Sequence, residues 1–274
     1  MNLGGEMFLE NCEILENKLV AGHNYLMKVK GDKTVKAAKA GQFYMLQCKN
    51  GVYFLRRPIS LHYADKENNI LEFYYEIKGG GTKDLASMKA GEIINIQGPL
   101  GTGFTTEISG KELLVVGGGM GMAPMKLLIE VLSKNNKVTF IAGGRNREAM
   151  EIMSNFNLDG IENYITTDDG SVGIHGNVIV KMEELMKVKK YDMVFTCGPQ
   201  KMMEAVAKTA KKFETKCEIS LEARMACGVK ACVGCSIKTK FGMKKVCHDG
   251  PVFDSETIVD FDPVVEKTET CCGN

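Results

Sequence analysis

The sequence lacks a long apolar run and an excess of charge of one sign. None of its 274 residues lies in a stretch that approaches the roughly 18 apolar residues of a membrane-spanning helix. Its 35 basic residues are balanced by 34 acidic ones, and the net charge of +1 argues against nucleic acid or an acidic membrane surface as the main partner. With 44% hydrophobic and 25% charged residues, the chain has the composition of an ordinary globular protein without a membrane span.

The sequence also begins without a charged, then an apolar, then a small-residue segment, so nothing in it predicts export. Ten cysteines without such a segment predict a reducing cytoplasm, where thiols serve as ligands more readily than as cross-links. Most cysteines outside the pattern described below are expected to be small buried residues or parts of the tail. These are Cys12, Cys48, Cys197, Cys217, Cys271 and Cys272.

The length exceeds what one hydrophobic core usually fills, so two or three domains are expected. Residues 1–105 carry short apolar or alternating runs, as at 42–48, 70–77 and 93–97, which predict an antiparallel barrel or sandwich. The stretch 98–103 is rich in glycine and contains a proline. We expect it to be a loop at the end of this first domain.

Residues 106–215 alternate strand patterns with helical ones, which predicts a parallel sheet covered by helices. The expected strands are 113–116, 138–142, 161–166 and 193–196, and the expected helices are 124–133, 149–155, 177–186 and 201–212. Residues 216–274 form a Cys-rich third domain with a hairpin arm at 240–246. A domain of this size rarely folds without a metal, a disulfide or a partner. The fold class is therefore mixed β and α/β.

Four cysteines in the third domain have the spacing C-x4-C-x2-C followed by a later cysteine. They are Cys227, Cys232, Cys235 and Cys247. This is the plant-type pattern for a 2Fe–2S cluster, where three ligands come from one tight loop. Gly228 and Gly234 fit such a loop, because it needs unusual dihedrals and little bulk near the sulfides.

Two other roles for these cysteines stay open. A structural zinc site usually has two C-x2-C knuckles, whereas here only Cys232 and Cys235 form one. Disulfides are less favoured, because nothing predicts export to an oxidising compartment. A zinc-stabilised interaction module without redox turnover is therefore the alternative from another functional class.

A second chemical motif is the glycine-rich stretch 116–124 between a predicted strand and a predicted helix. Glycines let the backbone approach a diphosphate, and helix N-terminal amides face the anion. A tight turn without a nucleotide is the alternative. The next strand ends in Gly143, Gly144 and Arg145 rather than in an acidic residue for a ribose, so this is a different dinucleotide site from the usual Rossmann one, or no site.

Three further stretches could contact a cofactor. Cys197 and Gly198 follow a later strand of the same sheet, on the rim where ligands collect, although a simple turn into a helix at Pro199 explains them as well. The run 56–60 offers arginines suited to phosphate and a serine suited to a ring, with surface arginines as the alternative. The glycine-rich turn 78–85 leads into a short helix, where Thr82 and nearby amides could take another phosphate.

These stretches, in this order, resemble the ferredoxin reductase superfamily. In that superfamily a flavin-binding β-barrel with an Arg-Pro-x-Ser motif precedes a nicotinamide-binding α/β domain with Gly-Gly-x-Gly-x-Ala-Pro and Cys-Gly-Pro motifs. Residues 222–235 and the Asp-Gly-Pro-Val-Phe run after Cys247 narrow the resemblance to the electron-transfer subunits of dihydroorotate dehydrogenase B. Lys230 is a departure, since members of this family often have glycine there.

The resemblance implies a role for each motif. FAD would be bound by Arg57 near the diphosphate, by Ser60 near the isoalloxazine ring, and by Pro58, Ile59, Gly79, Gly80, Gly81 and Thr82. NAD would be bound by Gly118, Gly119, Gly121 and Ala123, with Cys197 and Gly198 beside the nicotinamide.

The resemblance further implies that an FMN-containing catalytic subunit oxidises dihydroorotate in pyrimidine biosynthesis, and that this chain passes the electrons through a 2Fe–2S cluster and FAD to NAD. The two subunits would form a heterotetramer in the cytoplasm. Such chemistry needs no acid–base dyad, so the four histidines are expected at the surface or behind the site: His23, His62, His175 and His248. A related NADH-dependent ferredoxin:NADP oxidoreductase or sulfide dehydrogenase subunit is the rival, and Arg145 and Arg147 keep NADP open.

Overall fold

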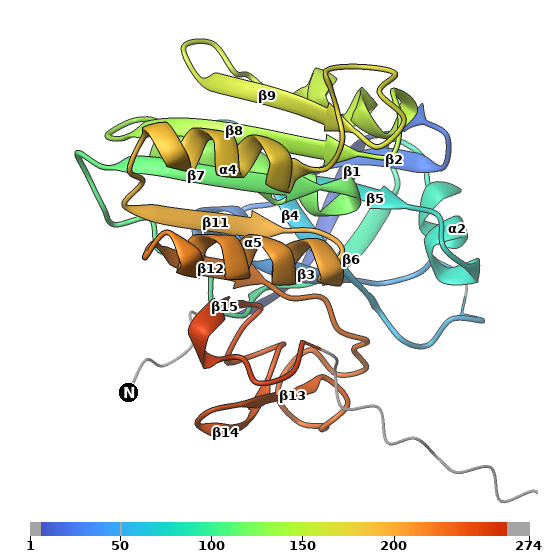
Figure 1. Ribbon diagram of the computed structural model, residues 1–274. Helices are drawn as coiled ribbons and strands as arrows, with labels where there is room; N and C mark the ends of the chain where they lie inside the picture. The colour runs from blue at the N-terminus through green and yellow to red at the C-terminus, as the bar shows by residue number, and fades with distance from the viewer. Residues whose placement is uncertain (1–6, 50, 262–274) are drawn as a thin grey trace, which may run out of the picture.

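The computed structural model describes residues 7–49 and 51–261. Figure 1 shows a barrel, a sheet covered by helices, and a small C-terminal lobe below the sheet. Cys271 and Cys272 lie outside the described residues.

The N-terminal part is a closed barrel of six antiparallel strands, in the order β1-β2-β5-β4-β3-β6. The barrel prediction is therefore confirmed over the sandwich. Its strands are β1 Phe8–Ala21, β2 Asn24–Lys30, β3 Phe43–Leu46, β4 Arg57–Asp65, β5 Ile70–Glu76 and β6 Ile93–Leu100, and its helices are α1 Lys33–Lys36 and α2 Gly80–Ala86. In β1, buried Cys12 and Ile14 alternate with exposed neighbours, which is the period of a strand with one face in a core.

Strand β6 continues through Gly98 and Pro99, where the sequence predicted a loop. This expectation was wrong because the register between β3 and β6 shifts at this point, and such an irregularity accommodates glycine and proline within a strand. A Cβ on Gly98 would lie 2.3 Å from the ring of Tyr44, so glycine also allows close packing here.

The second part is a seven-stranded sheet in the order β10-β9-β8-β7-β11-β12-β15, parallel except for β15. This confirms the predicted parallel sheet. Its strands are β7 Glu112–Gly118, β8 Lys137–Gly144, β9 Glu162–Thr167, β10 Ile174–His175, β11 Met193–Cys197, β12 Lys216–Ser220 and β15 Val252–Asp254. Strands β12 and β15 both come from the range assigned to the third domain, and the domain boundaries stay predictions.

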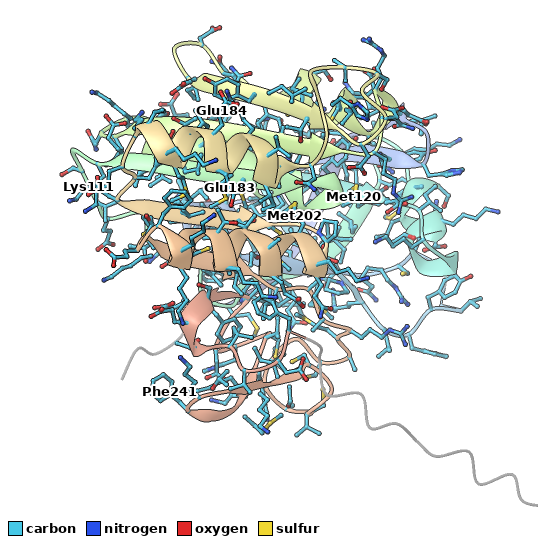
Figure 2. All side chains as sticks on the ribbon, viewed as in Figure 1. Lys111, Met120, Glu183, Glu184, Met202 and Phe241 are labelled. Carbon is cyan, nitrogen blue, oxygen red and sulfur yellow. The ribbon has the colours of Figure 1, made fainter. Side chains whose placement is uncertain are left out.

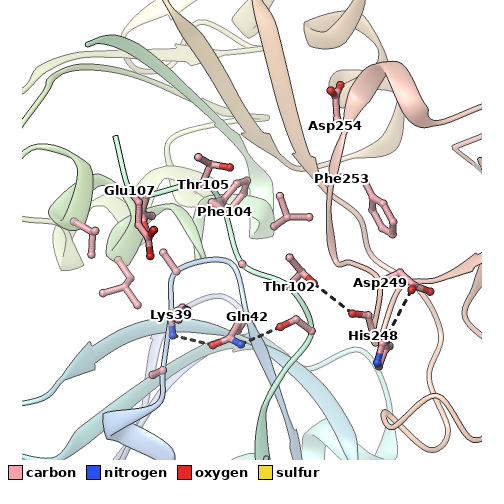
Figure 3. A pocket seen from close by; sticks show the side chains of 18 of the residues that line it. Lys39, Gln42, Thr102, Phe104, Thr105, Glu107, His248, Asp249, Phe253 and Asp254 are labelled. Atoms are coloured by element: carbon pink, nitrogen blue, oxygen red, sulfur yellow. Dashed lines mark hydrogen bonds and ion pairs between the residues drawn. The ribbon is translucent and has the colours of Figure 1, made fainter. Parts of the chain in front are cut away.

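Helices cover the sheet as the periodicity indicated. They are α3 Met125–Leu132, α4 Val178–Val188 and α5 Gln200–Lys212, with 3-10 turns η1 Gly119–Met122 and η2 Glu148–Asn155. Helices α4 and α5 lie side by side on one face, where Glu183 pairs with Lys212 at 2.9 Å (Figures 1 and 2). Helix α3 instead contacts both β4 of the barrel and β7 and β8 of the sheet. In the part of the chain that the structure describes, no helix is long and apolar enough to cross a membrane.

The C-terminal lobe holds the cysteine loop and a hairpin of β13 Ser236–Thr239 and β14 Gly242–Lys245, followed by the 3-10 turn η3 Ser255–Thr257. The expected hairpin arm at 240–246 is thus the turn and second strand of this hairpin. Gly101 ties the lobe to the barrel, because its Cβ position lies 2.4 Å from the carbonyl oxygen of Gly250. The lobe therefore packs directly on the end of β6.

Candidate functional site

The start of β4 carries four residues predicted to bind flavin: Arg57, Pro58, Ile59 and Ser60. The Nε atom of Arg57 is buried and has no hydrogen-bond partner among the described residues. Leaving such a donor unpaired is costly, and an anionic ligand would satisfy it. Arg56 has a different role, since its guanidinium donates to the backbone oxygen of Asn95 at 3.0 Å and also to that residue's side chain.

Glycines of α2 pack against this arginine. A Cβ on Gly81 would lie 2.3 Å from Nε of Arg57, and one on Gly80 would lie 1.9 Å from the hydroxyl of Tyr53. The Tyr53 ring in turn lies 5.9 Å from the guanidinium carbon of Arg57, within the range of a cation–π contact. The sequence therefore needs glycine at both positions to leave Arg57 in place.

The turn before α2 is shaped by Thr82. Its hydroxyl accepts hydrogen bonds from the backbone amides of Lys78 at 2.9 Å and Gly79 at 3.2 Å. These bonds satisfy two amides at the helix start. The hydroxyl thus has a structural contact, and its contact with a phosphate stays a prediction.

A cavity of about 790 Å³ opens at the carboxyl ends of the parallel strands, where ligands of such sheets bind. Four of the predicted glycines line it: Gly118, Gly119, Gly121 and Gly198. Barrel residues line it as well: Asn24, Tyr74, Glu76 and Lys78. The cavity therefore lies between barrel and sheet, where a ligand can contact both.

Two loops meet at the floor of this cavity. A Cβ on Gly121 would lie 2.4 Å from the backbone of Gly198, so the loops after β7 and β11 touch through bare backbone. Two other predicted contacts, Ala123 and Cys197, are buried behind the cavity and do not line it. Burial raises the pKa of the Cys197 thiol far above its ordinary value, so this residue is neutral.

Of the two arginines that could bind a 2′-phosphate, only one lines the cavity. Arg145 lines the cavity together with the carboxylate-bearing Asp168. The guanidinium of Arg147 donates to the carbonyl oxygen of Ser171 at 2.7 Å, and Arg147 does not line the cavity. One arginine faces the cavity, and an acidic residue lines it too.

The four cysteines of the lobe lie as two pairs. The Sγ atoms of Cys227 and Cys232 are 3.3 Å apart. Cys235 and Cys247 form the other pair, with their side chains in contact and each 2% exposed. Two pairs of thiols match a two-iron cluster, in which each iron takes two protein ligands. Among the residues described, no three His, Cys, Asp or Glu side chains are grouped to hold a single metal ion.

One cysteine of each pair has a shifted pKa, and the two shifts are in opposite directions. Burial opposes ionisation of Cys227, but backbone N–H groups of Cys232 at 3.3 Å and Val229 at 3.5 Å lower its pKa to about 7. Burial raises the pKa of Cys247 to about 12. Because a metal ligand must be a thiolate, binding of iron would release a proton from Cys247.

The loop backbone confirms one glycine prediction and corrects another. Gly228 has a φ of +67°, and its Cβ position lies 2.8 Å from Met45. Gly234 is not among the residues with positive φ, so the expected unusual dihedral was wrong there. The left-handed residue is instead Lys230, with a φ of +64°, whose position in the sequence gave no such signal.

One contact that sequence reasoning did not predict lies behind the cavity. His62, which we expected at the surface or behind the site, is fully buried on β4. Its Nδ1 lies 2.7 Å from the carbonyl oxygen of Ala123, at the end of the glycine-rich loop. The available signal was a single histidine in a predicted strand, which identifies no partner.

A flavin-type barrel, a parallel sheet with a cavity at the junction, and a four-cysteine lobe define a reductase of the ferredoxin reductase class. A solved NADH-dependent reduced ferredoxin-NADP oxidoreductase structure matches 92% of this chain and 90% of its own, with a TM-score of 0.83 at 27% identity. A ferredoxin NADP+ reductase from Neisseria gonorrhoeae shares the fold, with a TM-score of 0.62 at 20% identity over 75% of this chain and 91% of its own.

Sequence relatives give the family. The model for the iron-sulfur cluster binding domain of dihydroorotate dehydrogenase B matches residues 222–259, which include all four cysteines. The dihydroorotate dehydrogenase B (NAD(+)) electron transfer subunit of Caldanaerobacter subterraneus subsp. tengcongensis is 39% identical over 90% of this chain and 97% of its own. That of Clostridium acetobutylicum is 38% identical over 90% and 96%. The chain belongs to this family of electron-transfer oxidoreductase subunits.

Proposed function

We propose that this chain carries electrons from an FMN-containing dihydroorotate dehydrogenase subunit to NAD. The two subunits would form a heterotetramer in the cytoplasm. It would hold a 2Fe–2S cluster, FAD and NAD. A flavin exchanges electrons singly with the cluster and in pairs with the nicotinamide, so it is the chemistry needed between them. The eight described cysteines are free thiols, which is consistent with a reducing compartment.

The observation that carries the proposal is the contact between the cysteine loop and β3, the strand that pairs with the proposed flavin strand β4. Gly228, next to Cys227, packs on Met45 of β3, and Met45 pairs in register with Pro58 of β4. The loop that would hold the cluster therefore lies one strand away from the residues that would hold the flavin. Close approach of two redox groups is what electron transfer between them requires.

The residues around each site have distinct tasks in this proposal. Arg57 would offer its buried, unpaired Nε–H to the FAD diphosphate, and the absence of a side chain on Gly81 leaves the guanidinium room there. Ser60 lies three residues along the same strand and would contact the ring. The glycines at the floor of the 790 Å³ cavity would let the protein backbone approach the NAD diphosphate closely.

NAD is favoured over NADP by the charges at the cavity. A 2′-phosphate gains from arginine and is repelled by a carboxylate. Arg147 already donates to Ser171, while Asp168 lines the cavity beside Arg145. This arrangement, together with the NAD(+) in the names of the relatives, supports the NAD assignment over the ferredoxin:NADP alternative.

The partner would dock near the cysteine loop. Two apolar side chains of that loop, Val229 and Val233, are 39% and 73% exposed. Exposed apolar residues beside an electron carrier suit a protein interface. The FMN subunit is the partner that this surface would take.

Co-purification from the source cell under anaerobic conditions tests the proposal. A tagged chain should bring down an FMN-containing dihydroorotate oxidase, and the complex should have the mass of two copies of each subunit. The tagged chain alone should be yellow-brown, with about two irons and one FAD per chain. A colourless zinc protein, or an NADPH preference in dye reduction, would contradict the redox reading and the NAD assignment respectively.

A further inference from the structure

His62 joins the flavin barrel to the glycine-rich loop of the nucleotide domain. It lies on β4, two residues after Ser60, and its side chain is completely buried. Its Nδ1 atom is 2.7 Å from the carbonyl oxygen of Ala123. Ala123 directly follows η1, whose glycines line the nucleotide cavity.

The chemistry of this contact fixes the state of the ring. A carbonyl oxygen only accepts hydrogen bonds, so Nδ1 of His62 must carry the proton and donate. The Nε2 atom is buried and has no partner in the described part of the chain. Burial, reinforced by nearby Lys126, lowers the pKa of His62 to about 4, so the ring is neutral. One donated hydrogen bond is therefore all that the ring makes.

The strand is distorted where the histidine occurs. Leu61 pairs with Phe73 while Tyr63 pairs with Glu72, so two residue steps on β4 face one on β5. This is a β-bulge, a feature that re-aims a side chain and is common beside active sites. The bulge interrupts the regular pairing of β4 at His62, whose ring contacts Ala123 and Phe156 outside the barrel.

The surroundings of the ring restrict its movement. Tyr74 and Phe156 lie against it, with ring centroids 5.7 and 5.8 Å away. Next to it, Lys126 of α3 pairs with Glu72 of β5 at 2.8 Å, and both side chains are only about one-tenth exposed. The loop and α3 are thus held to the barrel at two neighbouring points.

We propose that His62 is a positioning residue that sets the separation of the nicotinamide from the flavin. The inference rests on the proposed function. In the direction of NAD reduction, the reduced flavin FADH⁻ would transfer a hydride to C4 of NAD⁺. The products would be FAD and NADH, and no proton would be taken up or released. The rate of that step would depend steeply on distance, because β4 would hold the flavin and the glycine loop would hold the nicotinamide nucleotide.

Three variants separate positioning from packing. His62→Leu introduces an apolar side chain of similar length and removes the Nδ1–H hydrogen-bond donor. His62→Asn retains a donor, because the side-chain amide nitrogen of asparagine lies at the position of Nδ1 in the imidazole ring. Ile14→Ala is the matched control, since Ile14 is also fully buried but lies on β1, whose partners are β2 and β6. His62→Gln, with its donor one bond farther out, replaces His62→Leu if that variant does not fold.

Anaerobic stopped-flow measurement of FAD reduction by NADH is the first readout. We expect His62→Leu to slow the step at saturating NADH by about 10- to 100-fold, with the NADH dissociation constant changed less than about threefold. His62→Asn should recover most of the rate. Ile14→Ala should lower the melting temperature without this loss of rate.

Hydrogen exchange of the protein without NADH is the second readout. Peptides covering 117–127 should exchange faster in His62→Leu than in the wild type or in Ile14→Ala. Unchanged exchange there, or a rate loss equal in His62→Leu and Ile14→Ala, overturns the positioning role. A wild-type protein that NADH does not reduce overturns the proposed function instead, and the exchange comparison still decides whether His62 tethers the loop.

Discussion

Gly121 and Gly198 pack backbone against backbone at the floor of the nucleotide cavity. A Cβ on Gly121 would lie 2.4 Å from both N and Cα of Gly198, closer than any real Cβ contact. The two loops come from β7 and β11, which are neighbours in the sheet. Their contact fixes the shape of the cavity floor.

Gly121→Ala should therefore damage the nucleotide site. The added methyl group meets backbone rather than a flexible side chain, so the loops must separate. We expect NADH to bind at least about tenfold more weakly, with FAD and iron content unchanged. Titration of flavin reduction against NADH measures this. Gly160→Ala is the control, because Gly160 has a φ of +75° and open space around its Cβ position, so only backbone strain is added.

Arg57→Lys should reduce FAD binding, whereas Arg56→Lys should retain it. Lysine has no Nε–H at the buried position and cannot make bidentate contacts. The loss of one charge-assisted hydrogen bond is worth about 1.5–3 kcal/mol, or roughly 10- to 150-fold in FAD affinity. Fluorescence titration of the flavin-free protein checks it. Equal FAD affinities for the two variants would contradict the role given to Arg57.

Cys227→Ser should remove the cluster, and Cys217→Ser should not. Both residues are free thiols, but Cys217 is buried in β12 and lies outside the loop. Serine is a harder ligand than thiolate and holds iron–sulfur clusters poorly. Iron content and visible absorption of the anaerobic proteins give the comparison. Retention of about two irons by Cys227→Ser would exclude this residue as a ligand.

The elements that the sequence predicted best are those determined by the pattern of neighbouring residues along the chain. Alternating runs gave barrel strands, and the glycine-rich junction after β7 follows from a strand-to-helix turn. The loop expected at Gly98 was wrong because its strand pairing depends on distant β1 and β3. The contact of His62 with Ala123 spans 61 positions and depends on a bulge, so no local pattern could predict it.

Protonation of His62 should destabilise the fold at acidic pH. Its folded pKa of about 4 lies below the unfolded value of about 6.5, so the unfolded chain binds the proton first. Stability is complete above about pH 6.5 and is lost as the pH falls toward 4, by about 3 kcal/mol in all. Lys126 and Lys28 oppose the charged ring, while Glu72 favours it.

Denaturant unfolding at several pH values between 4 and 7 measures this loss. In His62→Asn the titrating group is absent, so the difference in unfolding free energy between wild type and variant should shrink as the pH falls. Carboxylates titrate in both proteins and cancel in the difference. A difference that does not depend on pH would place His62 in a more exposed setting than the structure gives it.

Lys230→Gly tests how much strain the cysteine loop carries. Lys230 has a φ of +64°, a conformation that costs a residue with a Cβ about 1 kcal/mol more than glycine. Its carbonyl oxygen accepts from the ammonium group of Lys245 at 2.9 Å, and that backbone contact survives the substitution. The variant should keep its iron and melt about 2 °C higher. The variant also loses a positive charge near the cysteines. This loss favours the oxidised cluster, so the midpoint potential measured by a redox titration followed by EPR should fall. A lower melting temperature would mean that the Lys230 side chain, through its 3.4 Å contact with His248, stabilises the loop more than its backbone strains it.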